Sequence, residues 1–299
     1  MTNHFSVQLN LLGLGLPTAS TLGHRDQQAV RQMLESFSVV YGAVKARHDN
    51  PRIIETGSGF STLVFSHLLS GGGGDLASID FGGHEAFTRN TRNDLEIMPI
   101  SVRFLTAPTI SLQQLETVWE VPNILAGAPL SACLDEIDLF VDFSQDDRRV
   151  LDASRFLNGP LTANALREYL SRVGLINNEL LNAYRSSGDE FDALAETTVK
   201  PVLEHLVLDF DPNLIYLDSG EFSTFIEFQI IDRTCKSGTF LVVQNILFPK
   251  SIKGFLISCA LMASPRWDVV WVDKSTPQGI VIAVRNGVPT GTEGRTSTK

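Results

Sequence analysis

The 299-residue sequence lacks several features that would define its class directly. It has no run of 18 uninterrupted apolar residues, so it predicts no membrane-spanning helix and no membrane partner. Its three cysteines, Cys133, Cys235 and Cys259, form no CxxC pair, which argues against a zinc knuckle and a disulfide framework. Its six histidines form no HxH or HxxxH pair, so no histidine metal site is expected. A reducing cytoplasm is the expected compartment.

Basic residues are scarce in the middle of the chain. The formal net charge is -10, and 18 of the 34 acidic residues lie between residues 111 and 211, with only 7 of the 24 basic ones. A surface of this sign repels phosphate backbones, so a nucleic acid is not an expected partner. The acidity either belongs to solvated helix faces or favours small molecules that are neutral or cationic.

Apolar periodicity predicts strands and helices that alternate along the chain, apart from a helical middle. Helices are expected at 25–47, 61–69, 85–95, 222–234 and 252–263. Strands are expected near 53–54, 75–80, 100–108, 213–218, 238–247 and, as a closing antiparallel hairpin, in 267–287. This alternation predicts an α/β fold with a doubly wound, mostly parallel sheet and helices on both faces. The hairpin should add one antiparallel strand at the sheet edge.

The same pattern predicts how the chain is divided. Residues 1–50 form an N-terminal arm and helix, and the arm lacks the basic segment of a secretion signal. The α/β domain comprises 51–110 and 209–289, with Gly71–Gly74 as a flexible connection. Residues 111–208 form an acidic helical insertion that could act as a lid or ligand pocket, and 290–299 a disordered tail. Aromatic residues of the insertion would either line that pocket or pack its helices: Trp119, Phe140, Phe143, Phe156 and Tyr184.

The segment IIETGSGFST joins the first expected strand to the first helix of the α/β domain. Gly57 and Gly59 allow a tight turn and a close approach of the backbone to a ligand. The free N–H groups at the start of the helix then point at that ligand. Asp80 ends the second strand, where a carboxylate can accept hydrogen bonds from both hydroxyls of a ribose. These features predict a site for a nucleoside-containing cofactor.

Glu55 discriminates between two such cofactors. Its carboxylate would repel the pyrophosphate of a dinucleotide, whereas the ammonium and sulfonium of S-adenosylmethionine (SAM) would be attracted to it. The turn also lacks a third glycine, because Ser61 and Thr62 stand where one is expected. SAM is therefore the predicted cofactor, and an NAD-dependent oxidoreductase is the alternative.

The glycine turn, Asp80, the later strands and the hairpin resemble class I SAM-dependent methyltransferases over residues 50–107 and 211–286. The resemblance implies a Rossmann-like, seven-stranded sheet. It also implies that the turn lines the methionine part of the cofactor, and that Asp80 and Phe81 hold the ribose and flank the adenine. The implied cofactor-binding residues are Glu55, Thr56, Gly57, Ser58, Gly59, Ser61, Thr62, Asp80, Phe81 and Asp218.

Polar residues also follow the fourth and fifth expected strands. Asp218 and Asn245 resemble the metal ligands of the catechol and caffeoyl-CoA O-methyltransferase group, but Gln244 replaces the second aspartate. A hard divalent cation prefers carboxylates, so no divalent metal is expected. A related group carries Asp-Gly-Gly-His after the fourth strand, and here Glu221 stands in place of that histidine. His84 is another candidate polar group.

Taken together, these residues predict a methyltransferase of small-molecule metabolism that moves a methyl group from SAM to an acceptor by in-line displacement. Asp218 or Glu221 is the predicted catalytic base. The departures at Gln244 and Glu221 also leave open a non-catalytic SAM-binding protein that docks a partner. The acceptor is not identified, and a homodimer stays open.

Overall fold

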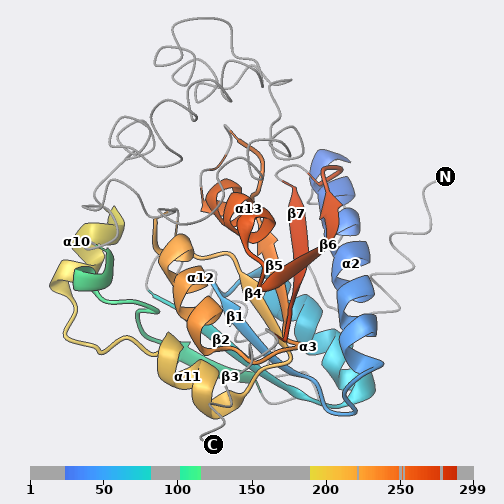
Figure 1. The fold of residues 1–299 in the computed structure, drawn as a ribbon, viewed down its shortest axis with the longest axis horizontal. Coiled ribbons are helices and arrows are strands. Elements are labelled where there is room, and N and C mark those ends of the chain that lie inside the picture. The colour runs from blue at the N-terminus through green and yellow to red at the C-terminus, as the bar shows by residue number, and fades with distance from the viewer. Residues whose placement is uncertain are drawn as a thin grey trace, which may run out of the picture.

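The computed structural model describes residues 24–81, 102–115, 189–220, 222–248, 251, 253–276 and 279–287 (Figure 1). Several predictions fall outside these ranges: the helix at 85–95, the tail at 290–299, His84, Glu221 and the aromatic residues singled out in the insertion.

A seven-stranded sheet forms the centre of the fold, with the strand order β3-β2-β1-β4-β5-β7-β6 (Figure 1). The strands are β1 Arg52–Thr56, β2 Asp75–Asp80, β3 Val102–Thr106, β4 Leu214–Leu217, β5 Phe240–Gln244, β6 Trp267–Asp273 and β7 Ile280–Arg285. Neighbours from β3 to β5 pair in parallel, whereas β7 is antiparallel to both β5 and β6. The predicted doubly wound, mostly parallel sheet with a closing hairpin is confirmed.

The hairpin differs from the prediction in one respect. Its antiparallel strand, β7, lies inside the sheet between β5 and β6, and β6 forms the edge. Five of the six residues of β7 are buried, whereas only Trp267 of β6 is buried. An apolar strand suits the interior of a sheet, and a half-exposed strand with acidic residues suits its edge, which explains the order.

Helices cover both faces of the sheet (Figure 1). On one face α2 (His24–Lys45) and α3 (Phe60–Gly72) pack on a core that includes Ile53 and Tyr216. On the other face α11 (Leu203–Phe210), α12 (Ser223–Thr234) and α13 (Lys253–Ala263) pack on a core that includes Ile54 and Leu217. Successive residues of β1 and β4 therefore face opposite cores, as the alternation of side chains along a strand requires.

Two predicted boundaries differ from those in the structure. Helix α3 continues through Gly71 and Gly72 and ends where the Gly73 N–H bonds to the carbonyl of Leu69 at 2.7 Å, with a positive φ at Gly73. The connection is thus shorter than predicted. The insertion was predicted to end at residue 208, which lies within α11, and that helix contributes Leu203, Leu206 and Val207 to the core. A short helix, α10 (Asp189–Glu196), precedes it.

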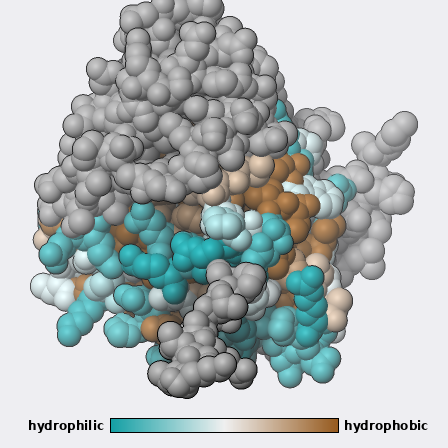
Figure 2. Space-filling view, in the orientation of Figure 1, coloured by the Kyte–Doolittle hydropathy of each residue, from teal (hydrophilic) through white to brown (hydrophobic). Residues whose placement is uncertain are grey.

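The described surface carries few large exposed apolar side chains. Figure 2 shows hydrophilic residues mixed with apolar ones, the latter gathered toward the side of β6 and α2. Val39 of α2 and Val270 and Trp271 of β6 are among the exposed ones. Among the described residues, no helix has the length and apolar character needed to cross a membrane.

Candidate functional site

The strand order reverses direction beside β1, which pairs with β2 on one side and β4 on the other. In doubly wound sheets, ligands bind beyond the carboxyl ends of the strands at such a switch point. The turn after β1 and the turn after β4 both lie at this edge, so the predicted site residues of these two segments come together. That a ligand binds at this edge stays a prediction.

Gly57 begins the turn after β1 with a φ of 83°. Its N–H donates to the carbonyl of Ile79 at 2.9 Å, and the N–H of Asp218 donates to the carbonyl of Thr56 at 3.1 Å. A Cβ at Gly57 would lie 2.3 Å from the backbone oxygen of Asp218. The glycine therefore permits a close approach between the ends of β1 and β4, an explanation that differs from the predicted approach to a ligand.

Glu55 lies at the centre of a buried cluster of hydroxyl groups. Its carboxylate is 0% exposed and accepts hydrogen bonds from Ser61, from Thr62 at 2.5 Å and from Ser78 at 2.8 Å. Thr62 also accepts a hydrogen bond from the N–H of Gly59 at 2.8 Å. Glu55 thus ties the N-terminus of α3 to β1 and β2, so that Ser61 and Thr62 support the turn from within.

Burial raises the pKa of Glu55 to about 7, although the hydroxyls of Ser61, Thr62 and Ser78 oppose that rise. Near neutral pH the carboxyl is therefore divided between its charged and neutral forms. The sequence argument for SAM over a dinucleotide assumed a full charge at the turn, so Glu55 alone discriminates less than predicted.

A second buried glutamate, Glu227 of α12, was missed by the sequence analysis. It is 0% exposed, and its carboxylate accepts hydrogen bonds from Thr56 at 2.9 Å, Ser219 at 2.6 Å and Thr109. Burial raises its pKa, while Lys253 is one of the groups that lower it. Glu227 holds together the ends of β1 and β4 and the loop after β3. The pattern Phe-Ile-Glu-Phe, with a carboxylate inside an apolar helix, is the signal that could have found it.

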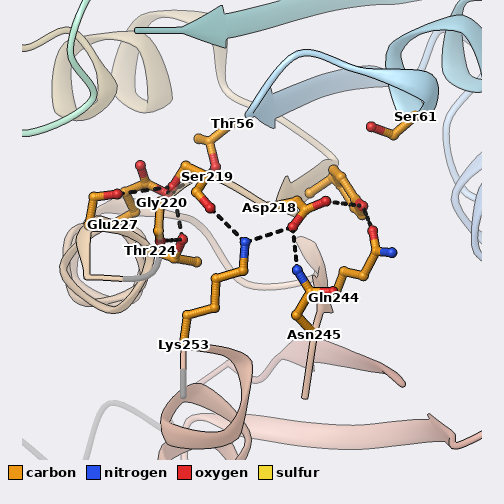
Figure 3. Close-up of polar contacts among 12 residues, drawn as sticks. Thr56, Ser61, Asp218, Ser219, Gly220, Thr224, Glu227, Gln244, Asn245 and Lys253 are labelled. Carbon is orange, nitrogen blue, oxygen red and sulfur yellow. Dashed lines mark hydrogen bonds and ion pairs between the residues drawn. The ribbon is translucent and has the colours of Figure 1, made fainter. Parts of the chain in front are cut away.

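Asp218 lies at the carboxyl end of β4 and is one-quarter exposed (Figure 3). Its Oδ1 accepts hydrogen bonds from Asn245 Nδ2 at 2.9 Å and Lys253 Nζ at 2.8 Å. Its Oδ2 lies 3.3 Å from the hydroxyl of Tyr216, but that hydroxyl has a single proton and lies closer to Oε1 of Gln244, so its main hydrogen bond goes to Gln244. These contacts fix the carboxylate at the edge between β4 and β5.

Lys253, the first residue of α13, was also missed. Its ammonium lies between Asp218 and the carbonyl of Ser219, to which it donates at 2.6 Å (Figure 3). No sequence signal marked it, since a lone lysine at the start of a helix is ordinarily a surface residue.

The candidate metal ligands do not fit a divalent cation. Asp218 Oδ1 already faces the ammonium of Lys253, and Asn245 presents its amide N–H₂, a donor, to the same carboxylate. Gln244 accepts from Tyr216. Within the part of the chain that the structure describes, no three His, Cys, Asp or Glu side chains are grouped as a metal ion would require.

The predicted ribose-binding residues stand at the end of β2. Asp80 is half-buried, and its carbonyl accepts the N–H of Ala107 at 3.2 Å. Phe81 is partly buried and packs against the core that includes α12 and α13. Their contact with a cofactor stays a prediction, as does the role of the predicted base Glu221. At this edge the ammonium of Lys253 pairs with Asp218, and Asp80 ends the neighbouring part of the sheet, while the carboxyl groups of Glu55 and Glu227 are buried behind the turns.

The sequence matches no protein-family model and no curated protein. Distant matches occur among solved structures. A methyltransferase of Podospora anserina with bound S-adenosylhomocysteine (SAH) is 10% identical with a TM-score of 0.40, and the match covers 96% of this chain and 89% of that one. An O-methyltransferase of Bacillus cereus in complex with SAH is 11% identical with a TM-score of 0.41, covering 94% and 97%. Matches this distant carry no argument about activity.

The class that the structure itself defines is a doubly wound α/β protein with a seven-stranded sheet and an antiparallel C-terminal hairpin. This is the fold that the resemblance to class I SAM-dependent methyltransferases implies.

Proposed function

We propose that this protein transfers a methyl group from SAM to a small-molecule acceptor. The observation that carries the proposal is the position of the glycine turn after β1 beside Asp218 after β4, both at the switch point of the sheet. Asp80 lies at the end of the neighbouring strand β2, so the ends of β2, β1 and β4 carry Asp80, the glycine turn and Asp218. Such an edge suits a ligand with a ribose and cationic groups.

The chemistry of these residues fits SAM. Asp80 would accept hydrogen bonds from the ribose hydroxyls, with Phe81 beside the adenine. The turn from Gly57 to Gly59, supported by Glu55, and the carboxylate of Asp218 would face the methionine part. The partly exposed carboxyl groups of Asp80 and Asp218 outnumber the ammonium of Lys253 at this edge, which favours a ligand of positive charge.

Bound SAM would supply a methyl group attached to a positively charged sulfur. The acceptor's nucleophilic atom would take this methyl group in line with the breaking sulfur–carbon bond, and SAH would leave. The residues contribute orientation, which can lower the barrier by several kcal/mol. If the acceptor loses a proton, Asp218 and Glu221 are the candidates to take it. Among the described residues, Oδ2 of Asp218 has only the long 3.3 Å contact with the hydroxyl of Tyr216, whereas Oδ1 accepts two shorter bonds. Oδ2 is the better placed of the two oxygens for that role.

An acceptor that is neutral or cationic suits the acidity of this edge and of the chain between residues 111 and 211. We propose that this middle region forms a lid or part of the acceptor pocket. The proposal predicts that no nucleic acid competes for the site.

Cofactor binding is tested by calorimetry with SAH and, separately, with NADH. We expect SAH to bind and NADH not to bind. Asp80→Asn should weaken SAH binding by about 1–3 kcal/mol, because it removes a charged acceptor from the ribose. Asp75→Asn is the matched control, since Asp75 is an exposed residue at the opposite end of the same strand. Binding of NADH but not SAH would refute the proposal in favour of an oxidoreductase.

Turnover is tested separately with methyl-labelled SAM and a panel of hydroxyl and amine acceptors. Release of SAH that depends on an acceptor supports a methyltransferase. Retained SAH binding without turnover on a broad panel would favour a non-catalytic SAM-binding protein.

A further inference from the structure

Lys253 occupies a position that local helix energetics do not explain. It is the first residue of α13, where the unpaired backbone N–H groups carry partial positive charge and disfavour a cation. Its side chain is only 7% exposed, so the ammonium has also lost most of its contact with water. A buried lysine at a helix N-terminus must be stabilised by acceptor groups from elsewhere in the fold. The identity of those acceptors indicates the role of the positive charge.

These acceptors lie at the end of β4. The ammonium donates to Asp218 Oδ1 at 2.8 Å and to the carbonyl of Ser219 at 2.6 Å (Figure 3). Gly254 makes this geometry accessible, because a Cβ there would lie 2.5 Å from the carbonyl oxygen of Gln244 and 2.4 Å from that of Asn245. The start of α13 therefore lies directly against the end of β5, which brings the ammonium to the strand edge.

Asn245 completes the arrangement. It adopts a φ of 62°, a conformation that asparagine tolerates better than most residues, and its Nδ2 donates to the same Asp218 oxygen. Its own Oδ1 is buried and accepts no hydrogen bond from any described residue. The amide of Asn245 and the ammonium of Lys253 therefore both donate to the same oxygen, Oδ1 of Asp218.

We propose that the ammonium of Lys253 takes the place of a divalent cation beside Asp218 and Asn245. It supplies the positive charge at this edge from within the chain and thereby positions the Asp218 carboxylate. The inference rests on the proposed function only in that Asp218 is a residue of its site. It predicts that the wild-type protein holds no divalent cation at this edge, and that removing the ammonium opens the place to one.

The presence of an ammonium in place of a metal ion also limits which ligands this edge can bind. An ammonium has three N–H groups, and two of those of Lys253 are used by Asp218 and Ser219, so at most one can reach a ligand. A divalent cation with six or more ligands can instead hold two neighbouring oxygens at once. We therefore expect that this ammonium does not hold an adjacent pair of acceptor oxygens.

Mn²⁺ serves as the probe, with binding measured by electron paramagnetic resonance on the full chain. Wild-type protein and Lys253→Arg, which keeps the charge, should show only weak binding that Asp218→Asn leaves unchanged. Lys253→Ala should bind Mn²⁺ about ten-fold more tightly than the wild type, and the added Asp218→Asn substitution should abolish the gain. Lys236→Met is the control that removes the same positive charge elsewhere. Lys236 forms an exposed ion pair with Asp211, which precedes the N-terminal end of β4.

Two results would overturn the proposal. Mn²⁺ binding by the wild type that Asp218→Asn abolishes would mean that the lysine moves aside for a metal. If Lys253→Ala folds but shows no Mn²⁺ binding that depends on Asp218, the ammonium only joins α13 to β4. If Lys253→Ala does not fold, Lys253→Met takes its place, because it removes the charge and keeps the length of the buried side chain. Failure of every form to bind SAH would count against the proposed function and leave the Mn²⁺ result standing.

Discussion

The buried carboxyl of Glu55 should make the stability of the protein fall as the pH rises. Its pKa is raised from an ordinary 4.5 to about 7, because burial penalises the charged form. Between these values the folded protein keeps the proton that the unfolded chain has released. The stabilisation linked to this proton is fully present below pH 4.5 and is lost as the pH rises through 7.

The size of the effect follows from the two pKa values. A group with pKa 4.5 in the unfolded chain and about 7 in the folded one contributes about 2–3 kcal/mol more to the free energy of unfolding at pH 5 than at pH 8. Glu55→Gln removes the titration. It keeps one acceptor for the hydroxyls of Ser61, Thr62 and Ser78, which can rotate to accept from the new amide N–H₂. The variant should lack this part of the pH dependence.

Urea denaturation at pH 5, 6, 7 and 8 measures the difference directly. The stability of the wild type minus that of Glu55→Gln should decrease by about 2–3 kcal/mol over this range. Burial also raises the pKa of Glu227, but that group is present in both proteins and cancels in the difference. Glu204→Gln, on the exposed side of α11, controls for the loss of one negative charge as such. A wild-type–variant difference that stays constant with pH would refute the reasoning.

Two further predictions concern the framework around the site. Gly57→Ala should cost about 2–4 kcal/mol in urea denaturation, because it combines a positive φ with a Cβ against the Asp218 backbone. Gly42→Ala, in α2 with open space around its Cβ position, should instead be neutral or stabilising, and an equal cost in both would contradict the argument. Asp232→Asn should cost about 1–3 kcal/mol, since its carboxylate joins α12 to two arginines and a tryptophan of the C-terminal hairpin region. An unchanged denaturation midpoint would show that this cluster is not coupled to stability.

The fold was predictable because its signals are local and repeated. Apolar spacing located β1, β2, β4, α12 and the hairpin within a few residues, since each element presents a face or a whole strand to one core. The position of β7 inside the sheet was not predictable from the same pattern. Both hairpin strands are apolar enough to be strands, and only the comparison of their burial separates the interior strand from the edge strand.

The site was predictable where the backbone defines it and not where side chains meet across elements. The glycine turn, Asp80 and Asp218 follow strand ends, so their common edge follows from the topology. Glu227 and Lys253 reach that edge from α12 and α13, through contacts with residues up to 171 positions away in the sequence. No spacing rule within one segment reports such contacts.

The charge of Glu55 shows why the identity of a residue does not determine its electrostatic role. The sequence places a carboxyl group beside the turn, but its protonation depends on the helix that covers it and on the hydroxyls that face it. The surroundings of Asp218 are more open, because its side chain is one-quarter exposed, and it is paired with an ammonium. In the proposed function, a preference for a cationic cofactor would come mainly from the partly exposed strand-end carboxyls of Asp80 and Asp218, while Glu55 and Glu227 hold the turns that present them.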